Sequence, residues 1–112
     1  MTAAELAVRP DKTILVDIRT APEWQQTGVI EGAHLLTFFD ARGEADPVAW
    51  MDQLEKIASP DDDLVLICRS GARTGVILNF LHRQTDYTTA RHLDGGMLGW
   101  LEKGMPVVSP VF

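Results

Sequence analysis

Short apolar runs alternate along this chain with segments of helical periodicity, and this alternation constrains the fold more than any other feature. The clearest run is LVLI at 64–67, followed by TILVDI at 13–18. Weaker runs at 32–38 and 88–93 are also expected to be strands. Strands separated by helices favour an α/β fold with a central, mainly parallel sheet and helices on both faces.

The segments between and after these runs are expected to be helices. They are TAPEWQQTG at 20–28, PVAWMDQLEKIA at 47–58, TGVILNFLHRQ at 74–84 and GGMLGWLEKG at 95–104. Thr20 and Glu23 have the spacing of a capping box, and Asp46 precedes Pro47 as an expected helix cap. The expected apolar faces are Val48, Trp50, Met51, Leu54 and Ile57 in the second helix and Val76, Ile77, Phe80 and Leu81 in the third.

Length and charge limit the kinds of function that need to be considered. The 112 residues are expected to form one domain, 1–112, because the chain is large enough for one core and too small for two. A formal net charge of −6 argues against a nucleic-acid partner, which requires clustered lysine and arginine in excess. No apolar run approaches the roughly 18 residues of a membrane span, so no membrane partner is expected.

The N-terminal segment, MTAAELAVRP, lacks the charged and apolar regions of a secretory signal. We therefore expect a soluble protein that is cytoplasmic by default, or periplasmic if an export signal was removed. Cys68 is the only cysteine, which excludes a disulfide within the chain. This thiol is expected to act alone or with the thiol of a partner.

The segment CRSGART at 68–74 joins the LVLI run to an expected helix. A loop of this kind turns backbone N–H groups toward one point, and the helix adds about half a positive charge at its start. This field favours a thiolate at Cys68, and Arg69 and Arg73 reinforce it. Ser70 can donate a hydrogen bond, and Gly71 permits close approach to a bound group. The residues predict a cradle for a small oxyanion around a reactive sulfur; the alternative is a buried, inert cysteine.

Four segments of the chain resemble the single-domain rhodanese family of sulfurtransferases. They are LVDIRTAPEW at 15–24, GVIEGAHLL at 28–36, LVLICRSGART at 64–74 and HLDGGMLGWLEKGMPV at 92–107. The resemblance implies a three-layer α/β fold with a mainly parallel, five-stranded sheet and a persulfide-forming cysteine, Cys68. It also implies that the loop binds the transferred sulfur and its donor through Arg69, Ser70, Gly71, Ala72 and Arg73. No metal or organic cofactor is implied.

The reaction that this resemblance implies has two steps. Thiolate Cys68 takes the outer sulfur of thiosulfate or another small sulfur-containing anion and releases sulfite. Cyanide or a thiol, which can belong to a protein, then removes the sulfur from the persulfide. Such a divided reaction predicts ping-pong kinetics.

Two alternatives to sulfur transfer are kept. The first is phosphatase or arsenate reductase activity. Protein tyrosine and dual-specificity phosphatases place five residues between cysteine and arginine, whereas Arg73 follows Cys68 after four and Thr74 stands at the required position. The loop is therefore one residue short for a tetrahedral phosphate. The other alternative is a non-catalytic rhodanese module used for docking, which the retained Cys68 argues against.

Residues outside the loop are expected to support it or to be structural. Those expected around the loop, without contact to substrate, are Asp17, Arg19, Thr74, Gly95 and Gly96. For the first two, a structural ion pair is the favoured interpretation, and Glu23 is expected to cap its helix. The three histidines, His34, His82 and His92, show no metal-site spacing and are interpreted as surface or hydrogen-bonded residues.

Overall fold

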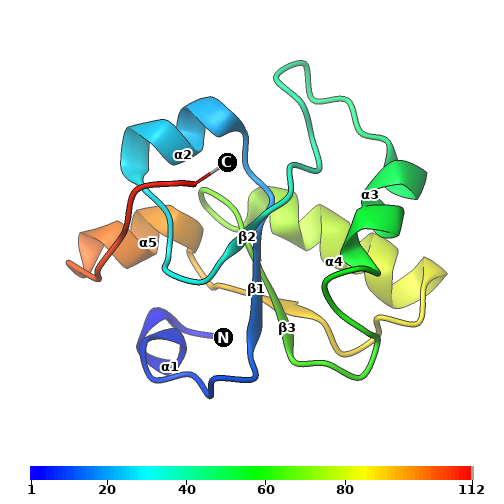
Figure 1. The fold of residues 1–112 in the computed structure, drawn as a ribbon, viewed down its shortest axis with the longest axis horizontal. Helices are drawn as coiled ribbons and strands as arrows, with labels where there is room; N and C mark the ends of the chain where they lie inside the picture. The colour runs from blue at the N-terminus through cyan, green and yellow to red at the C-terminus, as the bar shows by residue number, and fades with distance from the viewer. Residues whose placement is uncertain (112) are drawn as a thin grey trace.

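A computed structural model describes residues 1–111 and shows a parallel sheet between two layers of helices (Figure 1). Its elements in chain order are α1 (Ala3–Ala7), β1 (Ile14–Asp17), α2 (Ala21–Thr27), β2 (His34–Leu35), α3 (Pro47–Leu54), β3 (Leu64–Ile67), α4 (Ala72–Gln84), β4 (Arg91–His92) and α5 (Gly96–Glu102). The predicted α/β class is confirmed. No helix within residues 1–111 combines the length and apolar character needed to cross a membrane.

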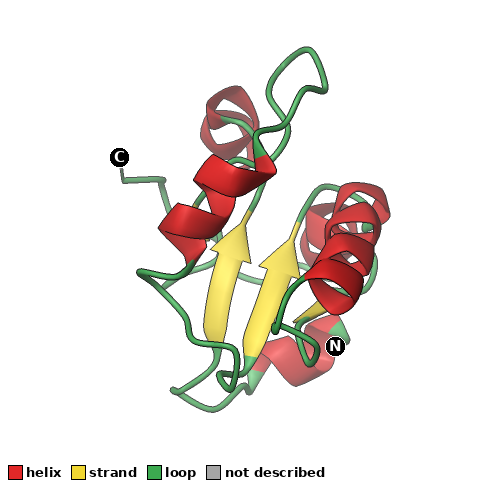
Figure 2. Ribbon diagram, turned by 90° about the vertical axis from the view of Figure 1, so that its right-hand side faces the viewer, coloured by secondary structure: helices red, strands yellow, loops and turns green. Residues whose placement is uncertain are grey.

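The strands lie in the order β2-β1-β3-β4, and every pair is parallel. In Figure 2 the two long strands, β1 and β3, point the same way, and they pair along all four residues of each. The prediction of five strands is wrong for the described residues, which form a four-stranded sheet. Up to residue 111, the C-terminal segment pairs through a single antiparallel bridge, between Val29 and Val108. Pro106 and Pro110 flank this bridge and lack the N–H groups that a longer ladder would need.

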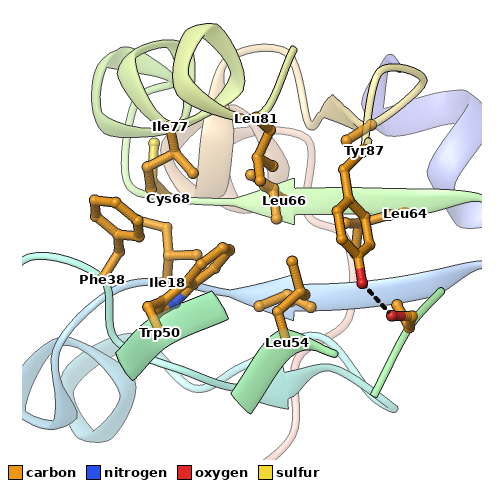
Figure 3. Close-up of a cluster of buried hydrophobic side chains, with 13 residues drawn as sticks. Ile18, Phe38, Trp50, Leu54, Leu64, Leu66, Cys68, Ile77, Leu81 and Tyr87 are labelled. Carbon is orange, nitrogen blue, oxygen red and sulfur yellow. Dashed lines mark hydrogen bonds between the residues drawn. The ribbon is translucent and has the colours of Figure 1, made fainter. Parts of the chain in front are cut away.

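Alternate residues of β1 and β3 face the two helical layers. Helices α3 and α4 cover one face of the sheet and α1 and α5 the other (Figure 1). The core between the sheet and these two helices contains Ile77 and Leu81 from α4 and Trp50 and Leu54 from α3. Cys68 lies at one end of this core (Figure 3). Burial of this face therefore fixes the side of the sheet from which the cysteine projects.

Helix boundaries follow several of the predicted signals. The Asp46 carboxylate accepts a hydrogen bond from the Ala49 N–H at 3.1 Å, and the Thr20 N–H donates to Glu23 Oε1 at 3.2 Å, as the caps predicted. The apolar faces were partly wrong, because Val48 and Val76 are 75% and 60% exposed. Val48 lies two residues, or about 200°, from the buried Trp50 around α3. Helix α1 was not predicted.

Candidate active site

Cys68 directly follows β3 and lies in the loop that leads into α4, at the carboxyl end of a central strand. Its Sγ accepts a hydrogen bond from the backbone N–H of Gly71 at 3.0 Å. Gly71 precedes the first turn of α4 with a φ of +102°, a left-handed conformation that glycine adopts without steric cost. The local sequence thus bends the loop so that an N–H group faces the sulfur.

The carbonyl groups of the loop are held by the first turn of α5. The Met97 N–H donates to the Cys68 carbonyl at 2.9 Å, and the Leu98 N–H donates to the Arg69 carbonyl at 2.9 Å. Because C=O and N–H point in opposite directions in a trans peptide, the N–H groups of Arg69 and Ser70 point away from α5. Four loop and helix-start N–H groups donate to no other group of residues 1–111: those of Arg69, Ser70, Arg73 and Thr74.

The close contact between the loop and α5 depends on Gly96. A Cβ at this position would lie 2.5 Å from the Arg69 carbonyl oxygen and 2.6 Å from that of Cys68. The neighbouring Gly95 is less restricted, since its Cβ would lie 3.8 Å from the nearest atom, in Gly99. Gly96 therefore allows the helix start to approach the loop backbone, whereas Gly95 mainly supplies a left-handed turn.

The two loop arginines have different surroundings. Arg69 is exposed, and its side chain makes no hydrogen bond or ion pair within the described chain. Arg73 donates to both carboxylate oxygens of Glu23, at 2.8 and 2.7 Å, although 50 residues separate them. The hydrogen bond from Arg73 lowers the pKa of Glu23 to about 2, and the same bond raises the pKa of Arg73. Glu23 thus both caps α2 and holds a loop arginine.

Thr74 lies next to the Cys68 sulfur, and His92 lies next to Thr74. Thr74 is fully buried, and its Oγ1 lies 3.4 Å from Cys68 Sγ and 2.6 Å from His92 Nδ1. The Thr74 hydroxyl also lies within donating distance of the Gly71 carbonyl, at 3.2 Å. Sequence reasoning placed Thr74 near the loop but gave His92 no role there. Its position two residues before Asp94-Gly95-Gly96 was the available signal.

Asp17 and Arg19 form a buried ion pair at the end of β1, with side chains 0% and 1% exposed. The guanidinium donates to both Asp17 oxygens, to Thr27 Oγ1 at 2.8 Å and to the Gly28 carbonyl at 3.1 Å. These contacts join β1 to the end of α2. The ion pair that the sequence predicted is therefore present.

The remaining histidines lie apart from this site. His34 is exposed in β2, and His82 Nε2 lies 2.7 Å from the Ala90 carbonyl oxygen. No group of three or more metal-binding side chains occurs among residues 1–111.

The chain is similar in sequence or in fold to several known proteins. A sulfurtransferase of Allochromatium vinosum is 35% identical over 100 residues, which cover 89% of this chain and 82% of that protein. Thiosulfate sulfurtransferase 18 of Arabidopsis thaliana is 28% identical over 120 residues, covering 95% and 87%. The crystal structure of a rhodanese-related protein from Thermoplasma volcanium superimposes with a TM-score of 0.74 at 23% identity, covering 98% of this chain and 97% of that one. The family model of the rhodanese-like domain matches residues 2–103, and the chain therefore belongs to the rhodanese-like domain family.

Proposed function

We propose that this chain is a single rhodanese domain, 1–112, that transfers a sulfane sulfur through a persulfide on Cys68. The family and the two relatives named as sulfurtransferases support sulfur transfer in general. One observation carries the assignment to Cys68: the Gly71 N–H donates to its Sγ at 3.0 Å at the start of a 13-residue helix. Backbone donors and the positive helix end both stabilise negative charge on sulfur.

In the proposed first step, the Cys68 thiolate attacks the outer sulfur of thiosulfate or a similar donor. A bond forms between Sγ and that sulfur, the S–S bond of the donor breaks, and sulfite leaves with the electron pair. The unpartnered N–H groups of the loop are the donors that would bind the new persulfide anion. No metal or organic cofactor takes part.

The sulfonate oxygens of the donor are proposed to bind Arg69 and Arg73. Arg69 is exposed and has no competing partner in the described chain. Arg73 uses two of the five N–H groups of a guanidinium for Glu23, so three remain for substrate. Its pairing with Glu23 fixes the guanidinium at the loop before a donor arrives. We expect the Arg69 side chain to move to meet the sulfonate oxygens. We expect the Arg73 guanidinium to bind them from the position in which Glu23 holds it.

In the second step, cyanide or a thiol attacks the outer sulfur of the persulfide, the S–S bond breaks, and the Cys68 thiolate is restored. The acceptor can be a small thiol or a thiol on a protein. Phosphate-ester hydrolysis is disfavoured because Thr74 occupies the place of the arginine in the longer loops, and its side chain is buried against Cys68 and His92.

The proposal is tested by intact mass spectrometry of the reduced protein after incubation with thiosulfate. We expect the mass of one added sulfur atom, its removal by cyanide, and no gain in Cys68→Ser. Because the chain has one cysteine, the gain can be assigned to Cys68 without peptide mapping. No gain in a folded, reduced protein would refute a thiosulfate-derived persulfide.

A variant with one residue inserted between Cys68 and Arg73 tests the role of loop length. We expect this variant to gain hydrolysis of aryl phosphates and to lose sulfur loading. If insertion changes neither activity, loop length does not select between the two chemistries.

A further inference from the structure

A row of polar contacts leads from the buried sulfur to the protein surface. It runs from Cys68 Sγ to Thr74 Oγ1 at 3.4 Å, to His92 Nδ1 at 2.6 Å, and from His92 Nε2 to Asp94 Oδ1 at 3.7 Å. Cys68 and Thr74 are 1% and 0% exposed, whereas the side chains of His92 and Asp94 are 27% and 58% exposed. The row therefore joins a thiol that solvent scarcely reaches to groups that solvent does reach.

The Thr74 hydroxyl has one proton and three neighbours that can accept it: Cys68 Sγ, the Gly71 carbonyl and His92 Nδ1. When His92 Nδ1 carries no proton, it accepts the Thr74 proton at the shortest of these distances. Thr74 Oγ1 is then an acceptor for the thiol proton. When Nδ1 is protonated, it donates to Oγ1, and the Thr74 proton is free to point at sulfur.

We propose that Thr74 and His92 form a proton relay that ionises Cys68. The thiol proton moves to Thr74 Oγ1 as the hydroxyl proton moves to His92 Nδ1, which converts thiol and imidazole into thiolate and imidazolium. No electrons are exchanged. The imidazolium loses a proton to solvent through its Nε2 side. This inference rests on the proposed function, because the thiolate it supplies is the nucleophile for sulfur transfer.

Thr74 and His92 have different parts in the relay. Thr74 contacts the reacting sulfur, whereas His92 acts through Thr74 and is a positioning residue for its hydroxyl proton. Imidazole suits this part because its charge changes near neutral pH. In the ionised state, the Nδ1–H of His92 donates to Thr74 whether or not Nε2 keeps its proton, and Thr74 donates to the thiolate, beside the N–H of Gly71.

Other charged groups near His92 lie in the N-terminal residue, in β4 and in the turn that follows β4. Asp94 lies beside Nε2, and the α-amino group of Met1 lies 3.6 Å from Asp94 and donates to the His92 backbone carbonyl at 3.0 Å. Arg91, the preceding residue of β4, pairs with Asp63 at 2.9 Å. Asp94 is thus the carboxylate that faces the Nε2 side of the ring.

The test is a titration of the Cys68 thiolate by its ultraviolet absorbance, with Cys68→Ser as the blank. This signal reports ionisation directly and requires no reagent to enter the buried site. We expect His92→Gln and Thr74→Val to move the thiolate titration upward by about one pH unit or more, which is tenfold less thiolate below the midpoint. Thr74→Ser keeps the hydroxyl and is expected to restore the wild-type curve.

His34→Gln is the matched control, because His34 is exposed in β2 and apart from the loop. Its titration is expected to follow the wild type. Circular dichroism shows whether each variant is folded, and the imidazole resonances of His92 supply a second measurement on the wild-type fold. Their titration is expected to shift in Cys68→Ser, since the two groups exchange a proton. Unchanged thiolate curves in folded variants, or an unchanged His92 titration in Cys68→Ser, would overturn the relay.

The relay and the proposed function fail in different measurements. Sulfur loading without any effect of His92→Gln on the thiolate titration would retain sulfur transfer and refute the relay. A shifted titration without sulfur loading would retain the relay and refute the thiosulfate-derived persulfide.

Discussion

Replacing Gly96 by alanine would place one methyl group against the backbone of the candidate active-site loop. The added Cβ would lie 2.5 Å from the carbonyl oxygen of Arg69 and 2.6 Å from that of Cys68. Neither neighbour is a flexible side chain, so the helix start or the loop must move. That movement lengthens the hydrogen bonds from Met97 and Leu98 that hold the same two carbonyls.

Two costs contribute to the expected loss of stability. Gly96 has a φ of +59°, and a left-handed conformation costs an L-residue about 1–2 kcal/mol. The overpacking adds about 1–3 kcal/mol. Gly95→Ala provides the matched control, because its φ is +76° but its added Cβ has 3.8 Å of clearance. This control is expected to show only the conformational cost, about 1–2 kcal/mol.

Urea denaturation of both variants measures the difference between them. We expect Gly96→Ala to have the lower unfolding free energy by about 1–3 kcal/mol and to load sulfur from thiosulfate more slowly than Gly95→Ala. Equal unfolding free energies, within about 0.5 kcal/mol, together with equal loading rates would show that the loop does not depend on close approach by α5.

Three further substitutions test other parts of the structure by urea denaturation. Asp17→Asn leaves the buried charge of Arg19 uncompensated and is expected to cost about 3–5 kcal/mol. Leu54→Ala, at a side chain with 0% exposure, is expected to cost about 2–5 kcal/mol while leaving the Cys68 titration unchanged. Glu23 has a pKa near 2 when paired with Arg73 and an ordinary value of 4.5, so its carboxylate stabilises the fold above pH 4.5. That contribution is lost as the pH falls through 2. Glu23→Gln should therefore be less stable than the wild type by about 1 kcal/mol near neutral pH, and the two should converge in acid; a constant difference would contradict the pairing.

The central strand and the loop after it could be predicted because their signals are local. Leu64–Ile67 is buried along its whole length, and an unbroken apolar run of that length is typical of a central parallel strand. The edge strands were less predictable: 32–38 and 88–93 were expected, whereas the ladders include only His34–Leu35 and Arg91–His92. The length of an edge strand depends on how far its neighbour stays in register, which local sequence does not encode.

Helix α1 was missed although its signal is present. Thr2 and Glu5 form a capping box, with the Glu5 N–H donating to Thr2 Oγ1 at 3.1 Å and the Thr2 N–H donating to Glu5 Oε1 at 2.9 Å. The same spacing identified the start of α2. A five-residue helix has too few turns for apolar periodicity to show, so the cap was its only local signal.

Contacts distant in sequence account for the parts of the site that could not be predicted. Glu23 and Arg73 are 50 residues apart, and Thr74 and His92 are 18 apart. Each pair meets because different strands end at the same edge of the sheet. The sequence alone indicated that Glu23 caps a helix, that Arg73 lies in the loop and that His92 is isolated. The contacts between these groups and the loop depend on how α2 and β4 pack against it.

The same packing explains why the cysteine loop and the Gly95-Gly96 segment belong to one site. Helix α5 donates to the carbonyls of Cys68 and Arg69, so the following N–H groups turn the other way, toward the side left free of α5. Thr74, in the first turn of α4, is held by His92, which lies three residues before Gly95. One continuous segment, 92–98, thus orients the loop backbone through its helix start and the Thr74 hydroxyl through its histidine. A substitution at either end of that segment should therefore alter Cys68 by a different route: Gly96→Ala through the backbone donors, and His92→Gln through the proton.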